Sequence, residues 1–238
     1  MAIKARPVAI IPARGGSKRI PHKNIVDFCG KPLIAWTIEA ALESTCFDRV
    51  VVSTDDARIA EVAAACGAQV PFLREAHADD HSTVSMVAIH TLDQLEAKLG
   101  LHYETVASLQ ATSPLRNAED IRTALASFAA NDAPTQMSCF KFHWATPWWA
   151  FERNSGGNAA WLHPEMIEKR SQDHPPLFGL TGAICIGKTT ALRAQGSFYG
   201  PLQRYEPISW QSAIDIDDPE DLAFAEAVYA QMRATRPR

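Results

Sequence analysis

An apolar run that leads into a basic, glycine-bearing loop decides the fold: Ile10-Ile11-Pro12-Ala13-Arg14-Gly15-Gly16-Ser17-Lys18-Arg19-Ile20-Pro21-His22-Lys23-Asn24. The apolar residues predict a strand over residues 7–12, so the loop leaves the carboxyl end of that strand. Gly15 and Gly16 allow backbone N–H groups to approach an anion closely. Four side chains can neutralise phosphate charge and donate to its oxygens: Arg14, Lys18, Arg19 and Lys23. A solvated basic turn has the same composition, but the position after a strand favours a phosphate site.

The composition suits a single α/β domain over residues 1–238. Of the 238 residues, 47% are hydrophobic and 21% are charged, which is enough to bury a full core. The net charge is only -4 and the basic residues outside the opening loop are dispersed, so we expect a small anionic ligand and no nucleic acid. No apolar run is long enough to cross a bilayer, so we expect a soluble protein. Five scattered cysteines without a C-x-x-C pair indicate a reducing, cytoplasmic compartment.

Short β-branched runs alternate with longer runs of helical period along the chain. Besides residues 7–12, strands are predicted over residues 49–53, 70–73, 105–110 and 135–140. Helices are predicted over residues 32–44, 84–99 and 119–130. This alternation is typical of a mainly parallel, twisted sheet covered by helices, and we expect helices on both of its faces.

Two acidic residues follow the predicted strand 49–53. Asp55 and Asp56 come directly before a segment whose apolar residues have helical spacing, and Gly67 suits the end of that helix. We therefore interpret both aspartates as caps of this helix rather than as metal ligands.

Residues 141–180 interrupt the alternation and predict an insertion. The segment contains several prolines, a flexible Asn154-Ser155-Gly156-Gly157-Asn158 run, and four tryptophans, Trp144, Trp148, Trp149 and Trp161. So many aromatic residues without a regular period indicate a lid over the active site or a surface buried against another subunit. A long loop packed on its own domain is the alternative.

The run from Gly182 to Thr189 matches the Walker A pattern G-x-x-x-x-G-K-T. A phosphate-cradling loop must follow a strand, yet Ala183-Ile184-Cys185-Ile186 is itself an apolar, β-favouring run. The helix after it would end by Gly196, which is short for the helix of a P-loop enzyme. We therefore predict a strand and a turn here, and keep a P-loop kinase or NTPase as the alternative function.

A pair of aspartates near the other end of the chain forms the second candidate site. In an extended segment, Asp215 and Asp217 point the same way while Ile214 and Ile216 face the core. Two carboxylates on one face suit Mg²⁺, which completes its shell with substrate phosphate and water; exposed strand-end acids are the alternative. Asp218 followed by Pro219 predicts the start of a helix.

Four motifs in this order resemble the acylneuraminate cytidylyltransferases, also called CMP-sialic acid synthetases, a family that includes legionaminic and pseudaminic acid cytidylyltransferases. They are Ile11-Pro12-Ala13-Arg14-Gly15-Gly16-Ser17-Lys18 with Lys23-Asn24, Leu109-Gln110-Ala111-Thr112-Ser113-Pro114-Leu115-Arg116, Arg170-Ser171-Gln172-Asp173 and Ile214-Asp215-Ile216-Asp217. The likeness covers nearly the whole chain. It implies a Rossmann-like nucleotidyltransferase fold, CTP as donor, Mg²⁺ as cofactor and a nine-carbon (nonulosonic) sugar acid as acceptor. It also implies a homodimer formed through the insertion at residues 141–180.

The resemblance also implies roles for individual residues. Nucleotide binding falls to Ala13, Arg14, Gly15, Gly16, Ser17, Lys18, Lys23, Asn24, Arg74, Thr83, Gln110 and Thr112. Sugar binding falls to Gln110, Arg170, Gln172 and Thr181. Asp215 and Asp217 hold the metal, and Arg14, Lys18 and Asp217 are the catalytic residues.

The implied reaction is attack of the anomeric hydroxyl of the sugar acid on the α-phosphorus of CTP, which releases pyrophosphate. Arg14 and Lys18 would stabilise the developing pyrophosphate, and Asp217 is the candidate proton acceptor. Relatives often have Asn-Gly-Ala-Ile-Tyr where this chain has Thr181-Gly182-Ala183-Ile184-Cys185, so we expect the sugar pocket to lose an amide and a phenol. A nucleotide-binding protein without turnover is a further alternative. His77 and His81 are interpreted as parts of a solvated loop.

Overall fold

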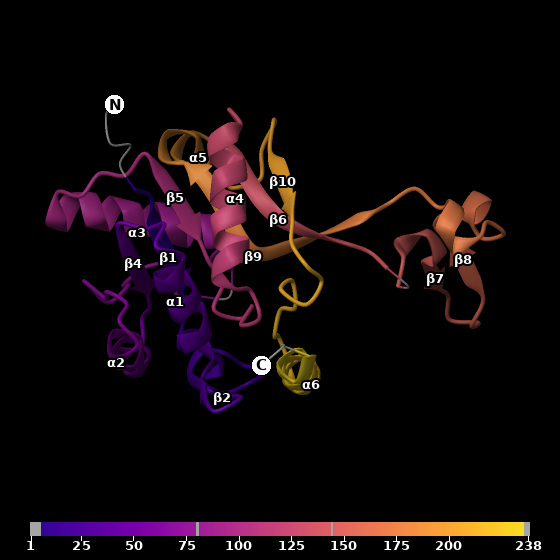
Figure 1. The fold of residues 1–238 in the computed structure, drawn as a ribbon, viewed down its shortest axis with the longest axis horizontal. Helices are drawn as coiled ribbons and strands as arrows, with labels where there is room; N and C mark the ends of the chain where they lie inside the picture. The colour runs from indigo at the N-terminus through magenta and orange to yellow at the C-terminus, as the bar shows by residue number, and fades with distance from the viewer. Residues whose placement is uncertain (1–5, 80, 144, 236–238) are drawn as a thin grey trace.

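The computed structural model describes residues 6–79, 81–143 and 145–235, which form a body of sheet and helices with one projecting arm (Figure 1). A six-stranded sheet lies at the centre of the body in the order β10-β6-β9-β5-β1-β4. Its strands are β1 (Val8–Pro12), β4 (Arg49–Ser53), β5 (Thr105–Ser108), β6 (Thr135–Lys141), β9 (Phe178–Lys188) and β10 (Arg204–Pro207). β1 is parallel to β4 and β5, and β10 is parallel to β6, whereas β9 runs antiparallel to β5 and β6. The predicted mainly parallel sheet is confirmed, with β9 as the exception.

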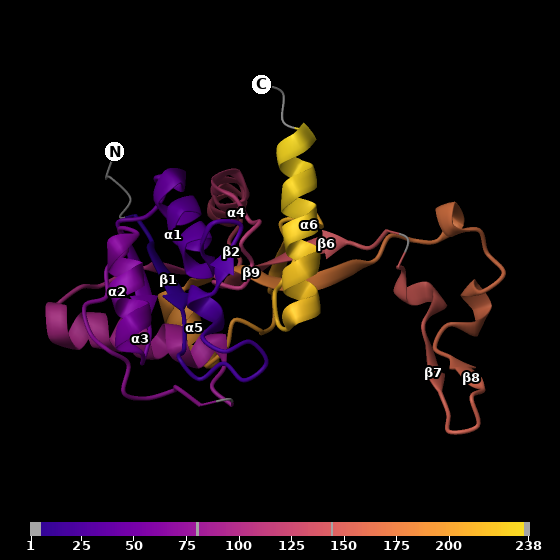
Figure 2. The ribbon, with the colours of Figure 1, turned by 90° about the horizontal axis from the view of Figure 1, so that it is seen from below.

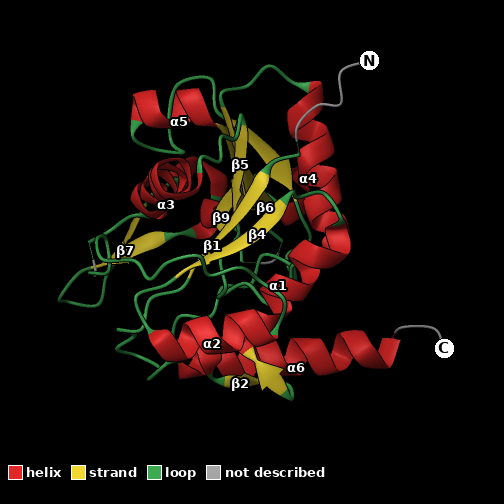
Figure 3. Ribbon diagram, turned by 90° about the vertical axis from the view of Figure 1, so that its left-hand side faces the viewer, coloured by secondary structure: helices red, strands yellow, loops and turns green. Residues whose placement is uncertain are grey.

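Helices cover both faces of the sheet, as predicted (Figure 3). Apolar side chains of α1 (Leu33–Ser44), α2 (Ala57–Ala65) and α4 (Ala118–Ala130) pack against one face. Those of α3 (Val84–Leu99) and α5 (Thr189–Gln195) pack against the other. β1 follows the two-residue period of a strand buried on both sides, because Ala9 and Ile11 join the first core while Val8 and Ile10 join the second.

A third apolar core joins parts of the chain that are far apart in the sequence. It lies beneath α6 (Pro219–Thr235) and the small β2 (Asp27–Phe28) and β3 (Lys31–Pro32) hairpin, and contains Ile20, Leu115 and Ile216. Burial of each such side chain contributes about 1.5–3 kcal/mol to stability. This packing brings together the end of the basic loop, the loop before α4 and the segment before α6.

Two of the predicted helix starts are confirmed by their caps. Oδ1 of Asp56 accepts a hydrogen bond from the Arg58 backbone N–H at 2.8 Å, at the start of α2. Oδ1 of Asp218 accepts from the backbone N–H groups of Glu220 and Asp221 at 2.9 and 3.0 Å, directly before Pro219 opens α6.

The strand predicted over residues 70–73 is wrong. The chain only touches the sheet there, through an isolated parallel bridge between Val51 and Gln69, and then turns away. A short apolar run can equally pack under a loop, which the local sequence does not distinguish from an edge strand.

The Walker A-like run is a strand, not a phosphate loop. Residues Gly182 to Lys188 lie inside β9, whose residues pair with β5 on one side and β6 on the other. α5 then begins at Thr189 and ends at Gln195, before Gly196 in the left-handed conformation. The P-loop alternative is therefore wrong, because the backbone N–H and C=O groups of this run pair with neighbouring strands and cannot surround a phosphate.

The insertion at residues 141–180 forms the projecting arm (Figure 2). A bulge follows Met137, after which Cys139 to Lys141 pair with Phe178 to Leu180 as a two-stranded ribbon that leaves the sheet. The arm contains the hairpin of β7 (Phe151–Arg153) and β8 (Ala159–Trp161) and several short 3-10 turns; Trp144 lies outside the described residues. The alternative of a loop packed on its own domain is wrong. In the part of the chain described, no helix has the length and apolar character that crossing a bilayer requires.

Candidate active site

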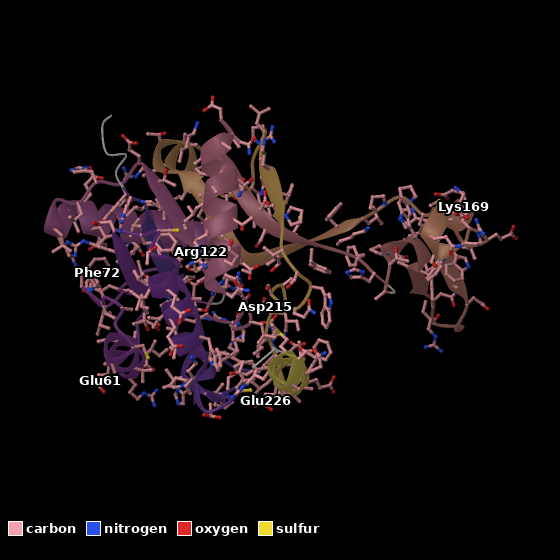
Figure 4. All side chains as sticks on the ribbon, viewed as in Figure 1. Glu61, Phe72, Arg122, Lys169, Asp215 and Glu226 are labelled. Atoms are coloured by element: carbon pink, nitrogen blue, oxygen red, sulfur yellow. The ribbon has the colours of Figure 1, made fainter. Side chains whose placement is uncertain are left out.

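Site residues predicted from both ends of the chain line one cavity of about 500 Å³. It lies at the carboxyl ends of β1 and β5, the edge at which open α/β sheets bind ligands. The loop after β1 contributes Ala13, Arg14, Ser17, Lys18, Lys23 and Asn24, and the loop after β5 contributes Gln110 and Thr112. Asp215, labelled in Figure 4, and Asp217 come from the segment between β10 and α6.

The basic loop is held by polar contacts to neighbouring segments. The Gly15 backbone N–H donates to Oδ1 of Asp55 at 2.9 Å, and Nδ2 of Asn24 donates to the Arg14 carbonyl at 2.9 Å. A Cβ at residue 15 would lie 2.8 Å from the Asp56 side chain, so only glycine fits there. The interpretation of Asp55 as a helix cap is wrong, because this carboxylate supports the loop 40 positions earlier in the chain.

Lys23 connects the basic loop to the aspartate pair. Its Nζ donates to Oδ1 of Asp217 at 3.0 Å and to the Ile216 carbonyl at 2.9 Å, and Nη2 of Arg19 lies 3.1 Å from Oδ2 of Asp217. Burial alone would raise the pKa of Asp217, but the hydrogen bonds and charges of Lys23 and Arg19 outweigh burial and hold the pKa below its ordinary value. Asp217 is therefore kept ionised.

Asp215 has a different electrostatic environment. Asp215 lines the cavity and is exposed to its solvent. Partial desolvation by nearby protein atoms raises the pKa of its carboxyl above the ordinary value, and the Asp217 charge raises it further, against a hydrogen bond with Thr112. The side chain of Ile216, between the two aspartates, is fully buried. The predicted alternation of acidic and core residues is confirmed.

The donor set of this pair fits Mg²⁺. Two carboxylates are hard oxygen ligands, and Mg²⁺ is commonly held by one or two carboxylates together with substrate phosphates and water. Within residues 6–79, 81–143 and 145–235, no group of three or more His, Cys, Asp and Glu side chains is arranged to hold a metal. The pair suits a metal that arrives with a phosphate substrate better than a metal enclosed by protein ligands.

Arg74 lines the cavity with a buried guanidinium. Its Nη1 donates to the Ser53 carbonyl at 3.3 Å, and its Nη2 lies 4.0 Å from Oδ1 of Asp55. Burial lowers the pKa of Arg74 below its ordinary value. Thr83 caps α3, where its Oγ1 accepts from the Met86 backbone N–H at 3.2 Å, and its neighbours Ser82 and Val84 line the cavity.

The Gln110 side chain lies against Gly182 of β9, where a side chain at residue 182 would displace the amide. A Cβ at residue 182 would lie 2.2 Å from Nε2 of Gln110, so the Gln110 amide occupies space that is free because residue 182 has no side chain. The carbonyl oxygen of Gln110 accepts from Oγ1 of Thr37 at 3.1 Å, and its Oε1 accepts from Oγ1 of Thr112 at 3.3 Å.

The residues predicted to bind the sugar do not lie together within a single copy of the chain. Oγ1 of Thr181 is engaged by the backbone, since it accepts from the Ala183 N–H at 3.2 Å and lies 3.4 Å from the Ala213 carbonyl, to which it donates. Arg170 and Gln172 lie on the arm, where Nε of Arg170 pairs with Asp173 at 2.8 Å. Figure 4 labels Lys169 at this arm and Asp215 in the body.

The Cys185 side chain does not line the cavity. Its side chain is buried in the core with Ile10, Leu192 and Phe198, on the face covered by α3 and α5. Complete burial raises the pKa of this thiol to about 12. The thiol therefore contributes to core packing.

His77 and Asp79 line the cavity, although neither was predicted to be a site residue. His77 has a left-handed backbone with φ of 58°, and its ring lies 5.4 Å from that of His90 on α3. The contact is made by packing across the fold, so no local pattern could have identified it. His77 lies in an irregular, partly exposed segment, as predicted, and also lines the cavity.

The chain is similar to known cytidylyltransferases along most of its length. Residues 8–146 match the family described as cytidylyltransferase. The chain is 35% identical over 222 residues to pseudaminic acid cytidylyltransferase of Campylobacter jejuni subsp. jejuni, with 93% of this chain and 95% of that protein covered. It is 37% identical over 228 residues to CMP-N,N'-diacetyllegionaminic acid synthase of Legionella pneumophila subsp. pneumophila, with the same coverage.

Solved structures agree on the fold. CMP:2-keto-3-deoxy-manno-octonic acid synthetase, complexed with CTP, matches 96% of this chain and 100% of its own with a TM-score of 0.72 and 20% identity. A 4-diphosphocytidyl-2C-methyl-D-erythritol synthase matches with a TM-score of 0.65 and 15% identity, over 96% of this chain and 100% of its own. The Rossmann-like nucleotidyltransferase fold is confirmed, and the chain belongs to the cytidylyltransferase family.

Proposed function

We propose that this protein transfers CMP from CTP to the anomeric hydroxyl of a nonulosonic, sialic-type acid and releases pyrophosphate. The observation that carries the proposal is the contact between Lys23 and Asp217, which closes a phosphate-binding loop and an acidic pair around one cavity. Relatives over nearly the full chain are named for pseudaminic and legionaminic acids, which supports an acceptor of this class.

Different residues of the cavity bind the triphosphate, the nucleoside and the attacking hydroxyl. Arg14 and Lys18 bind the triphosphate and stabilise the charge that develops on the departing pyrophosphate. Arg74 and Thr83 lie toward the nucleoside, and Gln110 and Thr112 lie at the junction of nucleotide and sugar. Asp217 is held ionised by Lys23 and Arg19, so it can orient the attacking hydroxyl, and it is the candidate proton acceptor.

Mg²⁺ is part of the proposal, with Asp215 and Asp217 as its protein ligands. When bound, the ion supplies neutralisation of phosphate charge and activation of the attacking oxygen. A cytoplasmic enzyme is also proposed, since scattered free cysteines suit a reducing compartment.

We further propose a homodimer formed through the arm. Phe151, Trp161 and Leu162 are 48%, 41% and 54% exposed on it, and large exposed apolar groups are typical of protein interfaces. At the base of the arm, Phe178, Leu180 and Tyr205 line an apolar groove of about 330 Å³. In such a dimer, Arg170 and Gln172 would reach the acceptor side of the partner's cavity.

Pyrophosphate release with CTP against a panel of nonulosonic acids tests the function. We expect release with at least one acid, and CTP rather than ATP to raise the unfolding temperature. Binding of CTP without release for every acid would instead support a nucleotide-binding protein without turnover.

A further inference from the structure

Arg116 is the largest side chain that the body buries completely, with 1% of its surface exposed. It lies in the loop between β5 and α4, directly before Asn117, the N-cap of α4. Arginine is rarely buried without an ionic partner, because removing its charge from water is costly. The position therefore needs an explanation that packing does not give.

The guanidinium makes its hydrogen bonds to Thr37 and to the backbone of Gln110, behind the cavity wall. Nη2 donates to Oγ1 of Thr37 at 2.7 Å and to the Gln110 carbonyl at 3.3 Å, and the same Thr37 hydroxyl donates to that carbonyl. Thr37 is fully buried on α1. Arg116 thus ties the chain at Gln110 to a rigid helix.

The rest of the guanidinium is poorly satisfied. Nε and Nη1 are buried and have no hydrogen-bond partner within the described chain. The carboxylate that acts on the charge is Asp120, and that carboxylate accepts the Asn117 backbone N–H at 2.9 Å in the α4 capping box. A buried cation with unmet donors weakens the fold, and such costs persist where function requires them.

The tied segment carries two groups of the site. The side chains of Gln110 and Thr112 line the cavity, and the Thr112 carbonyl accepts from the Ile216 N–H at 2.9 Å, between Asp215 and Asp217. One backbone hydrogen bond therefore separates the Arg116-anchored loop from the aspartate pair.

We infer that Arg116 is a positioning residue for the reaction, which fixes the segment from Gln110 to Thr112 and, through it, the segment from Asp215 to Asp217. This inference rests on the proposed function for its kinetic test. The guanidinium does not line the cavity, so it acts through the groups that it holds.

Arg116→Met and Arg116→Lys test this inference, with Arg122→Met as the matched control. Arg122 is a partly exposed arginine on α4 that pairs with Glu119 at the surface (Figure 4). Misplaced reacting groups commonly cost about 10²-fold in rate, so we expect Arg116→Met to lower kcat by about 10²-fold and Arg116→Lys by about tenfold. KM for CTP should change by less than about threefold, because the loop cations remain. Arg122→Met should match the wild type.

Hydrogen exchange gives a readout that does not depend on turnover. Backbone amides of residues 109–116 and 213–218 should exchange faster in Arg116→Met than in the wild type. Exchange is measured at a temperature well below the unfolding temperature of both proteins, so that both are folded. Unchanged exchange in these residues overturns the inference, whether or not the wild type transfers CMP. Failure of the wild type to transfer CMP would count against the proposed function alone. If Arg116→Met does not fold, Arg116→Lys decides: a folded variant with kcat within about twofold of the wild type overturns the inference.

Discussion

Nζ of Lys23 lies 3.0 Å from Oδ1 of Asp217, a residue 194 positions later in the chain. The apolar core of Ile20 and Ile216 brings the two segments together, and the ion pair then fixes their side chains. The Lys23 side chain is only 14% exposed, whereas the Asp217 side chain is 48% exposed, so the pair is shielded from solvent on its lysine side only. The contact makes the geometry of the acidic pair depend on the basic loop.

Lys23→Met should therefore damage the site more than it damages the fold. We expect kcat/KM for CTP to fall about 10²-fold, since a preorganised cation and the support of Asp217 are both lost. Lys188→Met is the control, because Lys188 forms an exposed pair with Asp132 and such pairs contribute only about 0–1 kcal/mol. Equal losses in the two variants, measured as pyrophosphate release, would contradict the role of Lys23.

Asp55→Ala should weaken CTP binding, because the Gly15 N–H loses its acceptor and the phosphate loop loses its support. A hydrogen bond to a charged group contributes about 1.5–3 kcal/mol, which corresponds to a weakening of about tenfold or more. Asp55→Asn retains an acceptor oxygen and should bind CTP nearly as the wild type does. Isothermal titration of CTP into the three proteins checks this, and an unchanged affinity of Asp55→Ala would remove Asp55 from the site.

The order of elements was predictable because it depends on local patterns. The continuous apolar run of β1 and the helical spacing in α2 and α3 are present in the sequence, and the apolar run from Ala183 to Ile186 was enough to reject a phosphate loop. The sequence motifs also identified the basic loop and the pair Asp215 and Asp217, which line the same cavity.

What could not be predicted depends on contacts across the fold. Asp55 follows a strand and precedes a helix, as a cap does, but the approach of Gly15 and Arg74 across the fold gives it other partners. Cys185 faces the core because the pairing of β9 with β5 sets its side. His77 reaches the cavity through a contact with α3 that no spacing in the sequence indicates.

Gly182→Ala should displace Gln110, since the new Cβ would lie 2.2 Å from its Nε2. We expect kcat to fall about tenfold or more, because the rate of a reaction decreases steeply when a positioning group is displaced. The double variant Gly182→Ala/Gln110→Ala should be no slower than Gln110→Ala alone, as the clash is then removed. Additive losses in this double-mutant cycle would show that Gly182 acts on something other than Gln110.

Charges on the arm should prevent dimer formation if the arm is the interface. Trp161→Glu and Leu162→Glu place charges on exposed apolar positions, so the fold of the body should be unaffected and association lost. Light scattering after size exclusion measures the mass. A monomeric wild type, or a dimer that persists in both variants, would contradict the proposed interface.

Asp215→Asn should change the metal requirement of the reaction. Removal of one anionic oxygen ligand weakens a Mg²⁺ site that otherwise depends on Asp217 and substrate phosphate, so we expect the Mg²⁺ concentration for half-maximal pyrophosphate release to rise about tenfold. Asp218→Asn is the matched control three residues later, because asparagine caps a helix about as well as aspartate and Asp218 serves as the α6 cap. The metal titration of the control should overlay that of the wild type. If the Asp215→Asn titration overlays it as well, Asp215 is not a metal ligand, and its place in the cavity would have to be explained by contact with the substrates themselves.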